Sequence, residues 1–120
     1  SLYEGCFKKL FYDCDGLIDA RAVIMPENTE PYCYQEMFEE CDNFKFPPYL
    51  PATTLSAYCY DSMFKDCSQL LIDLSRYGGR FFTCPEVVPE GAINDMILGT
   101  YNTECQEITP GNPYTWWNHA

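Results

Sequence analysis

The stretch "CYDSMFKDCSQL", Cys59–Leu70, decides how the chain folds, because the sequence contains it three times. The other two copies are "CFKKLFYDCDGL", which begins at Cys6, and "CYQEMFEECDNF", which begins at Cys33. All three share the pattern C-[Y/F]-x-x-[M/L]-F-x-x-C-x-x-[L/F], and their first cysteines, at 6, 33 and 59, are 27 and 26 residues apart. A fixed period of this length is typical of proteins built from stacked repeats.

Within one copy, the spacing of the apolar residues predicts a short helix. Cys59, Met63 and Cys67 recur every four residues, and Leu70 follows three residues later. Residues at these spacings share one face of a helix, and Phe64 falls beside that face. The motif is therefore predicted to form a helical turn with a buried face.

Short apolar segments that follow the motif predict strands over residues 17–20, 44–46 and 70–74. Prolines at Pro47, Pro48 and Pro51 then predict an extended turn, because proline fixes φ and removes a backbone donor. A unit of strand, proline-rich turn and short helix is too small to bury its own apolar face. The copies are therefore expected to stack on one another.

The segment "PPYLPATTLSAYCYDSMFKDCSQL", residues 47–70, resembles the leucine-rich repeats of the BspA-like type, which occur in surface proteins of gut Bacteroidetes. The resemblance covers about residues 1–75. It implies an α/β fold, a short right-handed leucine-rich-repeat solenoid with a C-terminal capping segment. Residues 1–80 would hold three repeats of about 26 residues, and residues 81–120 a degenerate repeat around "RFFTC" followed by the cap.

The repeat cysteines are expected to form two columns in the core, beside a column of phenylalanines. Three states remain open for them: buried free thiols, one or two disulfides between repeats, or a metal site. Zinc ligands are usually clustered, whereas this chain has no C-x-x-C and a single histidine, His119. Cys84 and Cys105 lie outside the columns and are candidates for a disulfide. The expected column residues are Cys6, Cys33, Cys59; Cys14, Cys41, Cys67; and Phe11, Phe38, Phe64.

Composition narrows the function classes. Eighteen acidic residues against seven basic ones give the 120-residue chain a net charge of -11, which disfavours binding to nucleic acid or to anionic lipid. The segment has no apolar run long enough to insert into a membrane. "DCDGLID", Asp13–Asp19, resembles half of a calcium loop, but Gly16 stands at the fourth position instead of the sixth, which favours a solvated turn. No cofactor and no catalytic residue is predicted, and the chain is not expected to be an enzyme.

The sequence and the resemblance together predict a non-catalytic binding or adhesion module, secreted or on the outer surface of a bacterium, with its signal or lipid anchor upstream. Its expected partner is a protein or glycan on a host or neighbouring cell. The alternative is a structural spacer that projects another domain, and a glycan hydrolase is the least supported class. Trp116 and Trp117 could cap the repeats, contact the ligand or belong to a disordered tail. The candidate contact residues, on the outward face of the expected sheet and at the C-terminus, are Ile18, Lys45, Leu71, Trp116 and Trp117.

Overall fold

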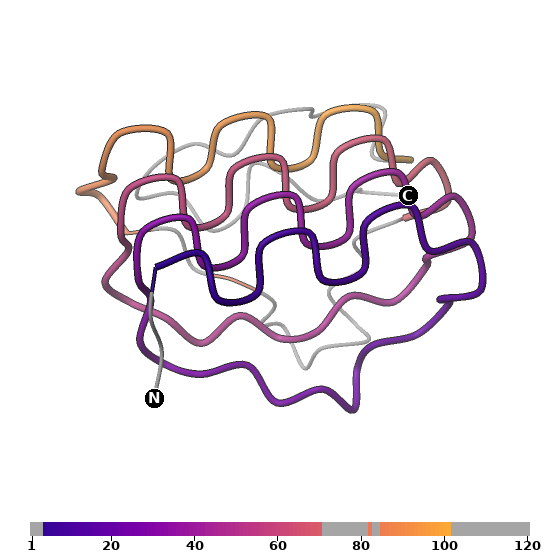
Figure 1. Ribbon diagram of the computed structural model, residues 1–120, viewed down its shortest axis with the longest axis horizontal. Coiled ribbons are helices and arrows are strands. Elements are labelled where there is room, and N and C mark those ends of the chain that lie inside the picture. Colours follow the sequence, from indigo (N-terminus) through magenta and orange to yellow (C-terminus); the bar gives the residue numbers. More distant parts are fainter. Residues whose placement is uncertain (1–3, 71–81, 83–84, 102–120) are drawn as a thin grey trace.

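The computed structural model describes residues 4–70, 82 and 85–101, and it places four stacked rungs of chain side by side (Figure 1). Rung 1 is residues 4–14, rung 2 is residues 31–41, rung 3 is residues 57–67 and rung 4 is residues 90–100. In Figure 1 each rung traces a square wave, from indigo through purple and magenta to orange. Segments 15–30 and 42–56 connect the first three rungs and run back along the opposite side.

Each rung is a series of tight turns. In rung 1 the N–H of Lys8 donates to the carbonyl of Gly5 over 3.1 Å, and the N–H groups of residues 10, 12 and 14 likewise bond three residues back. Every fourth residue has a positive φ, with values of 66° at Gly5, 57° at Lys9 and 54° at Asp13. An α-helix needs bonds four residues back and negative φ throughout. The helix predicted for each motif copy is therefore wrong, and no α-helix occurs in the described residues.

The remaining N–H groups of a rung bond to the next rung. The N–H of Phe7 donates to the carbonyl of Cys33 over 2.9 Å, and that of Lys9 donates to the carbonyl of Gln35 over 3.0 Å. Donors thus alternate along the chain between a turn within the rung and a bond across to its neighbour. This alternation satisfies the buried backbone without a helix or an extended strand. Turns that repeat every four residues and a helix with 3.6 residues per turn place the same apolar residues on one side. The spacing of these residues alone therefore does not distinguish the turns from a helix.

The predicted strands are also wrong. Of the segments 17–20 and 44–46, only Asp19 and Phe46 pair, in a single isolated parallel bridge. The third predicted strand, residues 70–74, lies outside the described residues beyond Leu70. Without helices and with one bridge in place of strands, the described chain is not an α/β leucine-rich-repeat solenoid, and the sheet face expected to carry the ligand is absent from it.

Rung 4 does not match the sequence pattern that the three motif copies share. It places Ala92 and Thr100 at the positions that cysteines occupy in rung 3, with Met96 aligned to Met63. The degenerate copy expected around residues 80–84 lies outside the described residues except for Phe82, which is buried and meets the ring of Tyr60 edge-on. The repeat therefore continues through a segment that has lost both cysteines.

Aromatic rings stack from rung to rung inside the fold. Phe38 lies 5.4 Å from Phe11 and 5.5 Å from Phe64, centroid to centroid, and Phe44 stacks on it at 4.6 Å. A second column joins three rings at 5.7 and 5.8 Å. Phe38 and Phe64 are fully buried, whereas Phe11 at the end of its column is half-buried. The rings of the second column are those of Phe7, Tyr34 and Tyr60.

One glycine is required by a close approach between rungs. The ring of Tyr58 stacks on that of Tyr32 at 5.0 Å and lies directly over Gly91 of rung 4. A Cβ at Gly91 would collide with three atoms of the tyrosine ring, and the φ of +66° would also disfavour any other residue. Rung 4 can approach rung 3 at this point only because residue 91 has no side chain.

Two neighbouring lysines test the turn structure against a helix. Lys8 and Lys9 are both exposed, but only Lys9 has a positive φ. We expect Lys9→Gly to keep or raise the free energy of unfolding, by up to about 1 kcal/mol, because glycine adopts this φ without a steric cost. Lys8→Gly should lower it by roughly 0.5–1 kcal/mol. Urea unfolding of both variants measures the difference, and equal losses would contradict the assigned backbone.

Candidate functional site

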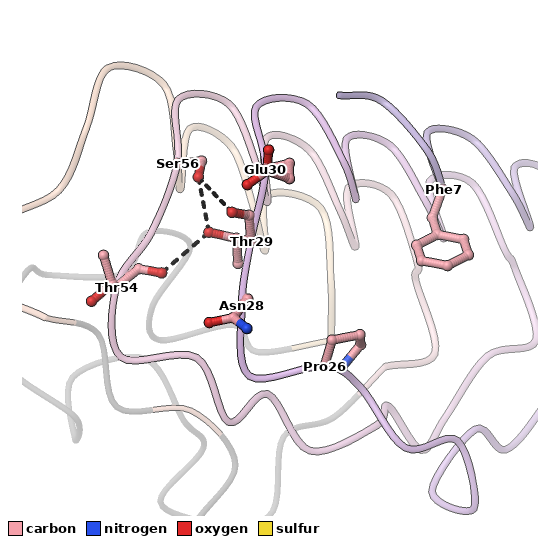
Figure 2. Close-up of a pocket in the computed structure, with 7 residues that line it drawn as sticks. All are labelled: Phe7, Pro26, Asn28, Thr29, Glu30, Thr54 and Ser56. Atoms are coloured by element: carbon pink, nitrogen blue, oxygen red, sulfur yellow. Dashed lines mark hydrogen bonds between the residues drawn. The ribbon is translucent and has the colours of Figure 1, made fainter. Parts of the chain in front are cut away.

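The main candidate site is a cleft of about 730 Å³ beside the ends of the rungs. The segment 26–30, which leads into rung 2, runs between Phe7 of rung 1 and the segment 54–56, which leads into rung 3 (Figure 2). The cleft is therefore built mainly from connecting segments and not from the repeated motif. Its lining residues are Phe7, Pro26, Asn28, Thr29, Glu30, Thr54 and Ser56.

Hydroxyl groups fix the two connecting segments to each other. The Thr29 hydroxyl lies 3.1 Å from both the carbonyl oxygen of Thr54 and the hydroxyl oxygen of Ser56, so its single proton serves one of them at a time. Ser56 donates its own proton to the carbonyl of Thr29 over 2.9 Å. Figure 2 shows these bonds grouped at one side of the cleft. They hold the wall in place and leave these hydroxyls little capacity for a ligand.

Two polar side chains of the cleft are available to a ligand. Asn28 and Glu30 are exposed, and neither side chain makes a hydrogen bond or ion pair in the described part of the chain. Pro26 and the ring of Phe7 supply apolar surface nearby. An amide can donate and accept, a carboxylate accepts, and an aromatic ring offers a flat apolar face. The cleft thus combines the groups that bind an uncharged polar molecule.

The residues predicted to contact a ligand lie elsewhere. The carbonyl of Ile18 accepts hydrogen bonds from the N–H of Lys45 at 2.8 Å and of Phe46 at 3.2 Å, so the structure brings Ile18 and Lys45 together. Both side chains are exposed, on connecting segments. Leu71, Trp116 and Trp117 lie outside the described residues, as do Cys84 and Cys105. Sequence reasoning missed the cleft, although the similar flanks "MPENTEPYCY" and "LPATTLSAYCY" contribute most of its residues.

The six repeat cysteines are free thiols, aligned from rung to rung. The Cys41 thiol donates to the carbonyl of Phe11 and the Cys67 thiol to that of Phe38, each over 2.9 Å. Burial raises the pKa of Cys33, Cys41 and Cys59 to about 11 and raises the pKa of Cys67 as well. These thiols are protonated at neutral pH and pack as small apolar groups.

The half calcium loop is not assembled. The Asp19 carboxylate pairs with the guanidinium of Arg21 at 2.7 Å, and this partner lowers the pKa of Asp19. The Asn43 amide donates to the carbonyl of Asp15 over 2.9 Å. Among the described residues no group of histidine, cysteine, aspartate or glutamate side chains is arranged to hold a metal ion, and no helix could cross a membrane.

A buried carboxyl group, that of Glu39 in rung 2, sits in an unfavourable environment. Burial, a hydrogen bond with Glu36 and the charge of Glu36 raise the pKa of Glu39 to about 7, and Lys65 of rung 3 offsets part of this. Because the folded-state pKa is raised, the stabilisation from the protonated group is present below pH 4.5 and is lost as the pH rises through about 7. Ionisation of Glu39 towards neutral pH therefore lowers the free energy of unfolding, although Lys65 of rung 3 attracts the ionised group.

We expect Glu39→Gln to remove part of this pH dependence. The wild-type free energy of unfolding should fall between pH 5 and pH 8, and the variant should lose less over the same interval, because glutamine stays neutral. Urea unfolding at both pH values measures the two losses. Glu27→Gln, at an exposed carboxylate, is the matched control and should follow the wild type. An identical loss in all three proteins would contradict the assigned environment of Glu39.

Thiol labelling tests the cysteine columns. In the native protein at about pH 8, the half-buried Cys6 and Cys14 should react with iodoacetamide first, and the four buried cysteines should react only after denaturation. Mass spectrometry of peptides, labelled without reductant, identifies each site. Buried cysteines that stay unlabelled in denaturant would show disulfides in place of free thiols.

Comparison with protein-family models, with curated proteins and with solved structures finds no match to the chain. The likeness to BspA-like surface proteins therefore rests on the repeated motif alone. The cleft and its unpaired polar groups are the features from which a function can be inferred.

Proposed function

We propose that the protein is a non-catalytic binding module that takes a neutral glycan in the cleft between segments 26–30 and 54–56. The single observation that carries the proposal is the combination of Phe7 and Pro26 with the unpaired side chains of Asn28 and Glu30 in one cleft of about 730 Å³. Binding clefts of such size are commonly formed by apolar surface with a few polar groups that fix orientation.

The chemistry of the lining favours a sugar over other small ligands. A pyranose ring presents an apolar face that can pack on an aromatic ring such as that of Phe7. Its hydroxyl groups both donate and accept, which matches the amide of Asn28 and the carboxylate of Glu30. A largely apolar ligand would leave both polar groups desolvated without partners, which is costly.

Charge favours a neutral ligand. The net charge of -11 and the carboxylate of Glu30 in the cleft both repel sulfated, phosphorylated or sialylated sugars. Glycoside hydrolysis by the common mechanism needs two carboxyl groups flanking the bond. Glu30 is the one carboxylate among the described residues that line the cleft, which supports binding without cleavage.

The motif supports an extracellular setting for this activity. Its resemblance to the repeats of bacterial surface proteins suggests a secreted or surface-attached chain that meets glycans of a host or a neighbouring cell. A spacer role is the alternative. It predicts that no ligand binds in the cleft.

A screen of neutral oligosaccharides followed by titration calorimetry tests the proposal. Asn28→Ala and Glu30→Gln should each weaken binding of the best ligand by roughly 5–10-fold, the worth of one hydrogen bond. Glu86→Gln, at an exposed acid outside the cleft lining, is the control for Glu30→Gln and should leave affinity unchanged.

A second variant tests whether the ligand binds in the cleft or at Ile18 and Lys45, which are adjacent on the connecting segments. The double substitution Ile18→Ala and Lys45→Ala should not affect affinity if the cleft is the site. A loss of binding with this variant but not with the cleft variants would move the site to that pair. A screen without any bound glycan would favour the spacer.

A further inference from the structure

The outer edge of rung 1 is a row of unused hydrogen-bond acceptors. Inside the stack, the carbonyls of Cys33, Gln35 and Met37 in rung 2 each accept an N–H from rung 1. The equivalent carbonyls of rung 1 accept no hydrogen bond in the described part of the chain. Side chains on this rung are also uncovered, since Leu10 is 53% exposed and Tyr12 is 42% exposed. The unused acceptors belong to Glu4, Cys6, Lys8, Leu10 and Tyr12.

Rung 4 presents the complementary edge. In rung 3 the N–H groups of Tyr58, Tyr60 and Ser62 donate to rung 4. The equivalent N–H groups of rung 4, at the partly exposed residues Gly91, Ile93 and Asp95, donate no hydrogen bond among the residues described. A fourth unused donor, at Ile97, belongs to a fully buried residue. The accessible donor edge is therefore the first half of the rung.

We infer that copies of this chain associate head to tail, with the donor edge of rung 4 in one copy bonded to the acceptor edge of rung 1 in the next. The register follows from the stack itself, where Tyr58 donates to Glu90 and Tyr60 donates to Ala92. By the same offset, the donors of Gly91, Ile93 and Asp95 face the carbonyls of residues 4, 6 and 8 in the next copy.

One pair of side chains at this junction is complementary in charge, Lys9 with Asp95, whereas the same register sets Glu90 beside Glu4 of the next copy, and both are acidic. Lys9, Glu36 and Asp95 occupy equivalent positive-φ positions in rungs 1, 2 and 4. Within the chain, the next rung places Glu36 opposite Lys9, and the proposed contact places Asp95 of one copy on the other side of Lys9. Rung 1 holds two of the seven basic residues of this acidic chain, at positions 8 and 9. Opposite charges held close across an interface favour this partner over others.

Apolar surface at the junction also matches. Ile93 stands in rung 4 where Phe7 stands in rung 1, and both side chains are partly exposed and packed against the core. The same register places Ile93 of one copy over the ring of Phe7 in the next, where it continues the ring column of Phe7 and Tyr34. Phe7 also lines the cleft, so this contact and a bound glycan compete for its ring.

The polarity of the edges determines the symmetry. Two rung 1 edges cannot pair with each other, because both offer only carbonyls. The contact is therefore heterologous and repeats from copy to copy, so it produces chains longer than two, as unpaired sheet edges can. The net charge of -11 per copy opposes association, which makes moderate ionic strength the appropriate condition.

Sedimentation velocity of the whole chain tests the inference, at about 10 µM to about 1 mM protein and roughly 0.15 M salt. The weight-average mass should rise with concentration and pass that of a dimer. A mass that stays at the monomer, or that stops at the dimer, would overturn the head-to-tail contact.

Two charge reversals make the test specific. Asp95→Lys places a lysine against Lys9 of the next copy and should weaken association at least about tenfold, the effect of one like-charge contact. Asp42→Lys changes the net charge equally at an exposed residue that follows rung 2, so it should associate at least as well as the wild type. Thermal melting confirms that both variants are folded, and equal weakening in both would refute the assigned edge.

Discussion

The hydrogen bonds between rungs are the interaction on which the rest of the structure depends. Rungs 1 to 3 each use only half of their N–H groups in their own turns, and the other half bond to the next rung. A single rung would leave those groups to water. It would also lack the hydrogen bonds that offset the steric cost of positive φ, which nine residues other than glycine adopt in the four rungs. The local conformation is thus a product of stacking, and long-range pairing stabilises turns that the sequence of one copy would not form alone.

The side-chain columns follow from this backbone constraint. Bonds at matched positions bring equivalent residues into register, so phenylalanine meets phenylalanine and thiol follows thiol. Each buried thiol that donates to the preceding rung, as Cys41 and Cys67 do, adds a side-chain bond parallel to the backbone ladder. The fit has defects, because the buried hydroxyls of Tyr34 and Tyr60 have no hydrogen-bond partner within the described part of the chain. Such groups cost free energy that the ring stacking must offset.

Repetition was readable from the sequence, whereas backbone conformation was not. The period, the stacking and the clustering of Cys33, Cys59 and Phe64 in the core all follow from identical residues at identical spacing. The helix was wrong because a four-residue turn repeat places Cys59, Met63 and Cys67 on one side as a helix would. Rung 4 could not be predicted from the motif, because Ala92 and Thr100 stand where the other copies have cysteines. The cleft could not be foreseen, since Phe7, Asn28 and Thr54 meet only through the stacking of whole repeats.

The recurrence of positive φ at every fourth residue has a consequence for recognising this backbone in other sequences. Among the residues that the structure describes, those that hold it besides glycine are lysine, aspartate, glutamate, serine and tyrosine, and none of them is β-branched or proline. An amphipathic helix would accept isoleucine or valine at many of these places, whereas the left-handed region strongly disfavours both. Repeated motif copies that never place valine, isoleucine, threonine or proline at every fourth position are therefore expected to form these turns. This criterion distinguishes the turns from an amphipathic helix, whereas hydrophobic periodicity does not.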